Sequence, residues 1–292
     1  MKIIFLGTAA SLPTAERAPP CIAINFNGEF VLFDCGEGCQ RQMRNRVSYI
    51  KIKKIFISHF HGDHYLGLLG LLQTMTLHKR TELIEIYTPP GGITFLKNYF
   101  ASGYVGLSYD VKIKELGEET VEFQDYFVES FHVEHKVPCL GFLFRQKDKR
   151  GKFDKVKANA LGIFNRMFGE LERLGSILIG GREVTLDDVT GEMRKGKKIV
   201  YSSDTLPMQK LVEKASDADV FICDSTFVHE EDRNDTLHCT VAEACSMARE
   251  ANVKRLLLTH ISQRYSSDEV LAEAKKHFEN VSVAEDFMEI EL

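Results

Sequence analysis

The chain alternates short apolar runs with amphipathic stretches over most of its 292 residues. The apolar runs are rich in β-branched and aromatic residues, which favours strands. We predict strands at residues 2–7, 21–26, 29–34, 54–59, 83–88, 142–145, 198–203, 219–224, 255–260 and 281–286. Asn27-Gly28 separates the second run from the third and predicts a type I′ hairpin, so the first sheet begins antiparallel.

Helical periodicity lies between several of these runs. Residues 240–251 carry apolar side chains at helical spacing and lead into the predicted strand 255–260, and residues 266–280 repeat this pattern with Ser at the start and Asn at the end. Strand, helix and strand therefore alternate in both halves of the chain. This order predicts an α/β fold with two mixed sheets packed face to face and helices outside them, which is a four-layer αββα sandwich.

The middle of the chain interrupts this order. Residues 146–180 contain a basic run and an amphipathic stretch, and we interpret them as an arm inserted into a single domain that spans residues 1–292. The run from Arg145 to Lys157 holds seven basic and two acidic residues. A solvated loop is one interpretation of such a run, and an anion-binding surface is the other.

The composition is that of a soluble globular protein, with 44% hydrophobic and 27% charged residues. No apolar run approaches the ~20 residues that a membrane span needs, and the first residues do not predict a secretory signal. The seven cysteines form no CxxC pair, so reduced thiols in the cytoplasm are expected. The net charge of −5 argues against a protein that coats nucleic acid over its whole surface.

The stretch "SHFHGDHYLG" at residues 58–67 concentrates metal-binding side chains. His59 and His61 are two residues apart at the end of a predicted strand, so an extended backbone points both imidazoles the same way. Gly62 permits a sharp turn that brings Asp63 and His64 to a neighbouring position at the start of a helix. Imidazole ligands suit zinc, and two adjacent positions suit a pair of ions.

Four residues do not complete such a site, so further ligands are expected downstream. His135, Asp204 and His260 each follow or close a predicted strand. This is where ligands gather in open α/β sheets. Lone histidines elsewhere, such as His78, His229 and His277, are interpreted as surface or core residues.

The motifs together resemble the ribonuclease Z family of the metallo-β-lactamase superfamily. The superfamily hallmark is HxHxDH after a strand. The family's further motifs have counterparts in "FLGTAASLPTAER", "LFDCGEGCQRQM", "HKVPCLGF", "SSDT", "LHCTVAEA" and "THISQRY", in the same order and over nearly the whole chain. One motif departs from the pattern, because the glycine-proline segment of the family's arm is absent and "GIFNRMFGELERLG" stands in its place.

The resemblance implies two zinc ions and assigns their ligands. One ion would be held by His59, His61 and His135, the other by Asp63, His64 and His260, with Asp204 bridging them. His132 competes with His135, but the spacing to "GF" matches the family only from His135. Asp34, Ser58 or Thr259 could orient the ligand imidazoles. Manganese or iron would also suit these ligands.

The resemblance also implies an activity, which is removal of the 3′ trailer of precursor tRNA to leave a 3′-hydroxyl on the tRNA and a 5′-phosphate on the trailer. Asp63 would accept a proton from water and His238 would act as the general acid. The substrate would meet the basic arm, at Lys147, Lys149, Arg150, Lys152, Lys155 and Lys157. A homodimer is implied, in which the arm of one subunit serves the other's metal centre.

Several alternatives remain open at this stage. A small-molecule hydrolase of the same fold, acting on a cyclic nucleotide, a phosphodiester or a thioester, would need no basic arm, and an RNA-binding protein without turnover would need no complete ligand set. A second basic surface is either an RNA contact or a solvated face. Its residues are Arg41, Arg44, Arg46, Lys51, Lys53 and Lys54. The sequence does not decide whether precursors that encode CCA are cut.

Overall fold

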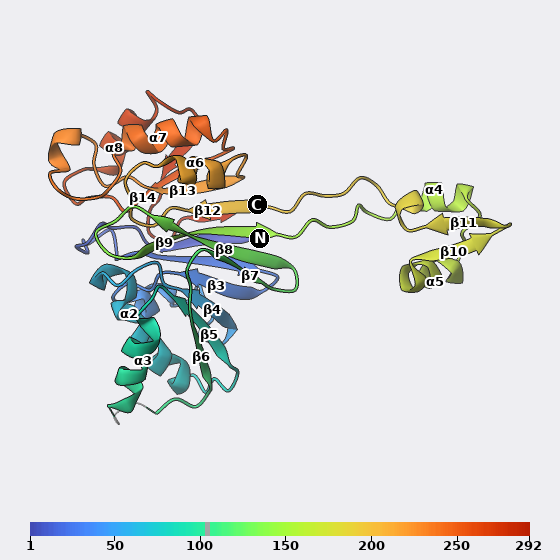
Figure 1. Ribbon diagram of the computed structural model, residues 1–292, viewed down its shortest axis with the longest axis horizontal. Helices are drawn as coiled ribbons and strands as arrows, with labels where there is room; N and C mark the ends of the chain where they lie inside the picture. Colours follow the sequence, from blue (N-terminus) through green and yellow to red (C-terminus); the bar gives the residue numbers. More distant parts are fainter. Residues whose placement is uncertain (103–105) are drawn as a thin grey trace. The chain divides into compact units, whose positions relative to one another are not determined.

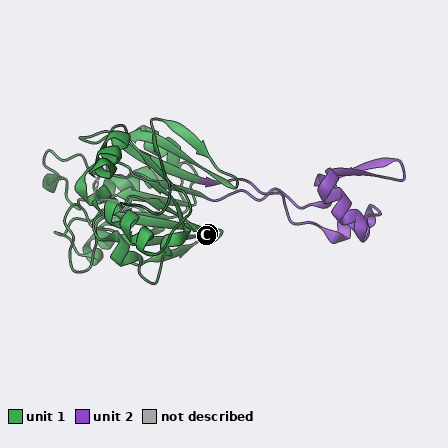
Figure 2. Cartoon of the chain, turned by 90° about the horizontal axis from the view of Figure 1, so that it is seen from below, with its two compact units in different colours: residues 1–144, 198–292 green, residues 145–197 purple. Residues whose placement is uncertain are grey.

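A computed structural model of the chain describes residues 1–102 and 106–292. It forms two compact units, one made of Met1–Phe144 with Lys198–Leu292 and the other of Arg145–Lys197 (Figure 2). We call the first the core unit and the second the arm unit. Each is described by itself below.

The core unit contains two seven-stranded mixed sheets (Figure 1). The first has the order β16 (Glu289–Glu291), β1 (Lys2–Gly7), β2 (Cys21–Phe26), β3 (Glu29–Phe33), β4 (Ile52–Phe56), β5 (Ile84–Thr88) and β6 (Val111–Glu115). The second has the order β15 (Val281–Val283), β14 (Leu256–Thr259), β13 (Val220–Asp224), β12 (Lys198–Tyr201), β9 (Cys139–Gln146), β8 (Tyr126–Val133) and β7 (Glu119–Glu122).

Helices cover the outer face of each sheet, which confirms the predicted αββα sandwich (Figure 1). The first sheet carries α1 (Cys39–Met43), α2 (Gly62–Leu77) and α3 (Gly92–Ala101), and the second carries α6 (Gln209–Ala215), α7 (Val241–Glu250) and α8 (Ser267–Ala274). Short 3-10 turns, η1 (Tyr49–Lys51) and η3 (Glu230–Asp232), lie in the connections. Among the described residues, no helix has the length and apolar character that crossing a membrane requires.

The space between the sheets is filled by aromatic and branched side chains. Phe33 of the first sheet stacks on Phe142 of the second with ring centroids 5.3 Å apart, and both rings are buried. Two further apolar clusters join each sheet to its own helices. Close packing of this kind fixes the sheets against each other, so the loops at their edges start from defined positions.

The local predictions hold with shifted ends. Asn27 and Gly28 both have positive φ, of 53° and 86°, as a type I′ turn requires, and β2 pairs antiparallel with β3. The predicted strand 54–59 is β4, which ends at Phe56, before His59. The predicted helix 266–280 begins after the cap Ser266 but ends at Ala274. It ends early because the chain turns there, with the amides of His277 and Phe278 both donating to the Ala274 carbonyl.

Strands β6, β7, β8 and β16 were not predicted. The first two alternate intermediate and exposed positions, and their sequences are rich in Lys and Glu. Charged residues are depleted in strands, so a pattern method misses such edge segments. Strand β8 is buried on one face, and its Glu and His residues interrupt the apolar pattern. Strand β16 is only three residues long.

The arm unit has a small core of its own. Helices α4 (Lys155–Ala160) and α5 (Arg166–Leu174), the hairpin β10 (Ser176–Ile179) and β11 (Arg182–Thr185), and the turn η2 (Asp187–Val189) surround Ala158, Ile163, Leu171, Val184 and Val189. The two chain segments that lead to it are paired, since Lys149 bridges to Arg194 and the Gln146 amide donates to the Lys197 carbonyl.

The arm unit therefore extends to Lys197, whereas the sequence predicted an end near residue 180. Residue 180 lies in the turn of the β10–β11 hairpin, where Gly180 and Gly181 both have positive φ. A Gly-Gly pair between the runs "SILI" and "REVT" is a hairpin signal. That signal would have placed the boundary after the hairpin.

Candidate metal centre

The residues of "SHFHGDHYLG" lie where the first sheet meets α2. His59 and His61 occupy the loop after β4, and the backbone of His61 is extended, with φ −74° and ψ 143°. Asp63 and His64 sit in the first turn of α2. The sharp turn predicted at Gly62 is therefore the start of this helix, and it separates the two histidines of the loop from Asp63 and His64.

The second sheet supplies the remaining predicted ligands. His135 lies between β8 and β9, Asp204 follows β12, and His260 follows β14 directly, with a positive φ of 59°. The structure brings all seven predicted ligands into groups whose nitrogen or oxygen atoms lie within 4.8 Å of one another. These groups are His59, His61, His135 and Asp204; Asp63, His64 and His260; and Asp204, Asp224, His238 and His260.

Asp204 stands between the groups. Its Oδ2 lies 3.6 Å from His59 Nε2, 3.3 Å from His64 Nε2 and 3.4 Å from His260 Nε2. It also lies 3.9 Å from His135 Nε2. One carboxylate oxygen thus faces ligands of both predicted ions. This is the position that a bridging ligand requires.

The buried donor atoms fit metal ions. His59 Nε2, His64 Nε2 and Asp204 Oδ1 are buried and have no hydrogen-bond partner among the protein atoms described. Buried polar atoms are rarely left without a partner, because that costs free energy. The Nδ1 atoms of the same two histidines are bound by protein groups, so only their Nε2 lone pairs point into the site. Imidazole and carboxylate groups converging in this way suit zinc.

Asp34 organises the side of the centre that belongs to the first sheet. This fully buried carboxylate accepts hydrogen bonds from the Ser58 amide at 2.8 Å, the Ser58 hydroxyl at 2.9 Å and the Tyr201 hydroxyl at 2.8 Å. It also binds His64 Nδ1 at 2.8 Å, and Ser58 Oγ lies 2.9 Å from His59 Nδ1. The sequence named Asp34 and Ser58 as orienting groups, and the structure places both in that position. It did not name Tyr201.

The second sheet orients its ligands differently from the prediction. Thr259 does not contact a ligand imidazole among the described contacts, because its carbonyl accepts from Ser225 instead. Thr226 takes the place expected for Thr259, with its Oγ1 2.9 Å from His260 Nδ1. The Leu237 carbonyl lies 3.1 Å from His135 Nδ1. Since backbone carbonyls orient ligands without any sequence signal, this partner could not be predicted.

His238 lies beside the ligands and is paired with a buried carboxylate. Its Nδ1 binds Asp224 Oδ2 at 2.9 Å, and its ring stacks on that of His260 with centroids 5.0 Å apart. Asp224 is fully buried and also accepts from Thr226 and from the Thr205 amide. The sequence predicted His238 but not Asp224. Asp224 ends the apolar strand β13, a position shared by other site residues, and that position was the available signal.

The electrostatics separate the imidazoles into two classes. Burial lowers the pKa of His59, His61 and His135, which keeps them neutral as metal ligands must be. Burial acts in the same direction on His238, but the Asp224 carboxylate outweighs it and raises the pKa of His238 to about 9. His238 is therefore protonated at neutral pH.

The carboxylates of the centre remain ionised. Burial disfavours the charge of Asp63, yet hydrogen bonds from His260 and His64 hold its pKa well below the usual range. The pKa of Asp204 is likewise held far below its usual range by His260 and His64, against the effect of burial. The amide of Ser11 adds a hydrogen bond to Asp63 Oδ2 at 3.1 Å.

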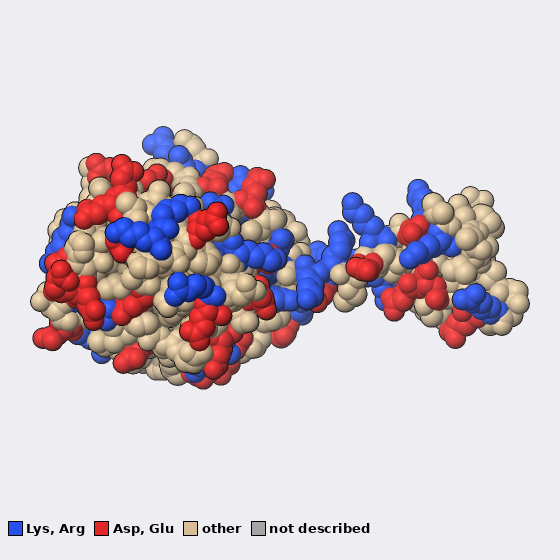
Figure 3. Space-filling model, turned by 90° about the horizontal axis from the view of Figure 1, so that it is seen from above, with Lys and Arg blue, Asp and Glu red and all other residues tan. Residues whose placement is uncertain are grey.

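The other predicted residues lie away from the centre or in the arm unit. His132 is exposed and belongs to none of the ligand groups. The predicted RNA contacts all lie within the arm unit, and they are Lys147, Lys149, Arg150, Lys152, Lys155 and Lys157. Figure 3 shows Lys and Arg side chains gathered along the paired segments of that unit. Arg194, Lys195 and Lys197 belong to the returning segment, which the predicted boundary excluded.

Comparison with known proteins accounts for this combination of fold and ligands. The family model for the beta-lactamase superfamily domain matches residues 188–261, and the model for the anti-Pycsar protein Apyc1 matches residues 1–150. Ribonuclease Z of Thermococcus onnurineus is 45% identical over 94% of this chain and 89% of its own length. The chain belongs to the ribonuclease Z family.

Further relatives agree with this family. The ribonuclease Z of Archaeoglobus fulgidus is 44% identical over the whole chain and 97% of its own length. The crystal structure of human tRNase Z, short form, matches with a TM-score of 0.73 at 27% identity and covers 100% of this chain and 99% of its own. The fold of this chain is thus the metallo-β-lactamase fold of its family.

Proposed function

We propose that this member of the ribonuclease Z family is a metal-dependent endoribonuclease that removes the 3′ trailer of precursor tRNA. The cut leaves a 3′-hydroxyl on the tRNA and a 5′-phosphate on the trailer. The observation that carries the proposal is the convergence of two ligand groups on Asp204, with the protonated His238 beside them. Family membership supports the choice of RNA as the substrate.

We propose that His59, His61 and His135 hold one zinc ion, that Asp63, His64 and His260 hold a second, and that Asp204 bridges them. When bound, the ions stabilise negative charge on the oxygens of the scissile phosphate and lower the pKa of water. The protein contributes the orientation of the ligands, through Asp34, Ser58 and Thr226.

Asp63 is placed to accept a proton. It stays ionised at neutral pH, and its side chain is 11% exposed, so it is the ligand carboxylate with access to solvent. Asp204, with 3% exposed, has no comparable access. The Ser11 amide and the flanking histidines fix the position of Asp63 Oδ2. We therefore assign Asp63 as the group that orients the attacking water and takes its proton.

His238 is placed to donate a proton. Because Nδ1 is bound to Asp224, the imidazolium directs its remaining N–H, at Nε2, away from that carboxylate. With a pKa of about 9, it carries this proton at neutral pH. We assign it as the general acid that protonates the departing 3′-oxygen, with Asp224 as the group that keeps it charged and oriented.

The arm unit supplies the positive charge that RNA binding needs. It holds thirteen Lys and Arg against eight Asp and Glu, a net charge of +5, which leaves −10 for the core unit out of the chain's −5. Phosphate contacts dominate the affinity of proteins for nucleic acid. We propose that the paired segments of the arm unit, from Arg145 to Lys157 and from Arg194 to Lys197, contact the phosphates of tRNA.

We propose that the active form is a homodimer. Leu66 and Leu77 of α2 are 49% and 82% exposed, and Leu69 between them is partly exposed. These positions follow the helical period, so they form one apolar stripe on the outside of the helix. A second copy of the chain would bury this stripe. We also propose a cytoplasmic location, which is supported by the seven free and buried cysteines.

The direct test is cleavage of one 5′-labelled precursor tRNA by purified protein, with and without a chelator, followed by mapping of the cut. We expect a single cut at the 3′ end of the acceptor stem that is lost with the chelator. Absence of any cut by the zinc-loaded protein would refute the proposed activity.

A second test separates this activity from that of a small-molecule hydrolase. Residues 148–195 are replaced by Asn-Gly, which closes the paired segments as a hairpin and leaves the core unit intact. We expect cleavage of precursor tRNA to fall by at least a hundredfold while bis(p-nitrophenyl) phosphate is still hydrolysed. Unchanged tRNA cleavage would contradict the role of the arm unit, and activity on small phosphodiesters alone in the intact protein would favour the alternative.

A further inference from the structure

The core unit contains one segment whose charge is opposite to that of the unit as a whole. Residues 38–62 hold six Lys and Arg and no Asp or Glu, whereas the core unit has a net charge of −10. The six are Arg41, Arg44, Arg46, Lys51, Lys53 and Lys54. The sequence left open whether they form an RNA contact or a solvated face.

The structure divides this set. Lys53 is paired with Glu82, and the ammonium group of Lys54 lies 4.5 Å from the centre of the Phe123 ring. Arg41 lines a different hollow that also contains Glu37 and Asp286. These three charges are accounted for by local partners or neighbours. Arg44 and Arg46 remain, and no carboxylate among the described residues lies within ion-pair distance of either of them.

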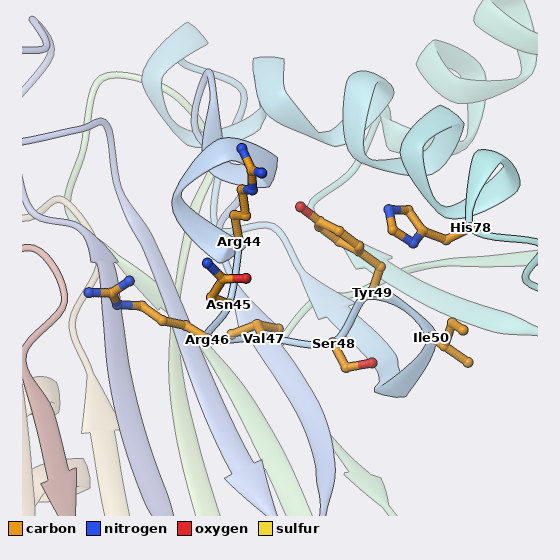
Figure 4. Close-up of a pocket in the computed structure, with 8 residues that line it drawn as sticks. All are labelled: Arg44, Asn45, Arg46, Val47, Ser48, Tyr49, Ile50 and His78. Atoms are coloured by element: carbon orange, nitrogen blue, oxygen red, sulfur yellow. The ribbon is translucent and has the colours of Figure 1, made fainter.

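Arg44 and Arg46 line a surface hollow of about 660 Å³ (Figure 4). Its walls are residues 44–50 and His78, and they include no acidic side chain. The rings of Tyr49 and His78 face each other with centroids 4.7 Å apart, and the Tyr49 hydroxyl points to the side on which Arg44 lies. Besides the arginines, Asn45, Ser48 and His78 can donate hydrogen bonds.

The hollow is built to hold its shape. The Tyr49 hydroxyl donates to the Gln40 carbonyl at 2.7 Å, and the Arg46 guanidinium lies 3.9 Å from the centre of the Phe287 ring. The buried Arg80 donates to the carbonyls of Tyr49 and Ile50 from beneath. An arginine that stacks on an aromatic ring is pre-organised, so less conformational entropy is lost when it binds an anion.

We propose that this hollow, residues 44–50 with His78, binds backbone phosphates of the RNA substrate at a distance from the metal centre. Guanidinium groups without a protein carboxylate suit phosphate oxygens, which they bind in pairs. The Tyr49 and His78 rings stack on each other, so they are not free to hold a base between them. The contact is therefore to the backbone and independent of sequence. This inference rests on the proposed function.

Helix α2 sets the distance between the two sites. It starts directly after the predicted ligand His61 and is followed by His78. Its sixteen residues span about 24 Å at 1.5 Å per residue. That is less than one turn of a duplex, which is about 34 Å. A stem whose 3′ end lies at the metal centre can therefore place a phosphate at the hollow within its first turn.

The test compares the double variant R44Q/R46Q with the matched control K275Q/K276Q. Both remove two exposed positive charges from the core unit, so a general charge effect would appear in both. Steady-state cleavage of precursor tRNA is measured at several KCl concentrations. For R44Q/R46Q we expect KM to rise about tenfold with kcat nearly unchanged, and the slope of log(kcat/KM) against log[KCl] to become shallower by about 1.4–1.8, as expected for two lost phosphate contacts. The control should differ from the wild type by less than twofold.

A further variant, Ser48→Glu, keeps both arginines and their packing and adds a negative charge to the wall of the hollow. We expect it to raise KM as well. Circular dichroism and metal content equal to those of the wild type show that the variants are folded. Unchanged KM and salt slope in both variants would overturn the inference while tRNA cleavage by the wild type still supports the proposed function.

Two other outcomes would also overturn the inference. Saturable binding of AMP or inorganic phosphate to the wild type but not to R44Q/R46Q, with unchanged KM for tRNA, would assign the hollow to a small anion. Loss of the dimer in R44Q/R46Q, measured by sedimentation, would assign it to the contact between subunits. If the wild type cleaves no tRNA, the proposed function itself fails.

Discussion

Replacing Tyr201 by Phe tests how the metal centre is held together. Tyr201 belongs to β12 of the second sheet, and its hydroxyl donates to Asp34, which follows β3 of the first sheet. Asp34 in turn binds His64 Nδ1 and Ser58. The hydroxyl of Tyr201 is thus a polar link between the two sheets, each of which supplies part of the ligand set.

The size of the effect follows from burial and charge. Asp34 is 0% and Tyr201 3% exposed, so water does not replace the lost donor without rearrangement. A hydrogen bond to a charged group contributes about 1.5–3 kcal/mol, and loss of a group that orients a metal ligand weakens metal binding about 10–100-fold. We expect Y201F to weaken zinc binding by this factor and to lower the free energy of unfolding of the metal-depleted protein by about 2 kcal/mol.

The matched control is Y109F. Tyr109 is also buried, but its hydroxyl donates to the neutral Leu72 carbonyl at 2.7 Å, within α2 and away from the metal centre. Its loss should lower the free energy of unfolding by about 1 kcal/mol and leave zinc affinity unchanged. Zinc affinity is measured by competition with a chromophoric chelator, and unfolding by urea titration. Wild-type zinc affinity in Y201F would refute the role assigned to this link.

Three further predictions concern the centre itself. In the wild type, kcat should fall as pH rises through about 9, because His238 loses its proton there, and in D224N this limb should move down toward the ordinary value near 6.5; an unmoved limb in the pH–rate profile would contradict the pairing. Asp63→Ala should abolish cleavage while a filter-binding assay still detects tRNA binding, and retained cleavage would remove Asp63 from the mechanism. Metal removal leaves buried atoms of His59 and Asp204 without partners, so calorimetry with a chelator should show a melting temperature about 5–10 °C lower, whereas an identical melting temperature would argue against bound metal.

Much of the local structure was determined by the sequence alone. The Asn27-Gly28 turn needs two residues that accept positive φ, and few other pairs do. Thr240 and Glu243 form a capping box at the start of α7, where the helical pattern begins. The spacing of His59, His61, Asp63 and His64 survives any shift of a strand end, since the four residues lie within six positions of each other. These features depend on neighbours in the chain.

The partners of the ligands depended on the tertiary structure. Tyr201 lies 167 positions from Asp34, and Thr226 lies 34 positions from His260. Sequence patterns report which residues are buried and which elements they form, but they do not report which buried hydroxyl faces which carboxylate. The packing of the two sheets decides that, and it selected Thr226 over Thr259.

The charges of the surface were decided in the same way. Arg44 and Lys53 belong to one basic run in the sequence, yet Lys53 reaches Glu82 and Arg44 reaches no acid among the described residues. The sequence fixes which charges exist, because each is a property of a single residue. Which of them are neutralised depends on distances between residues far apart in the chain, and only the folded core sets those distances.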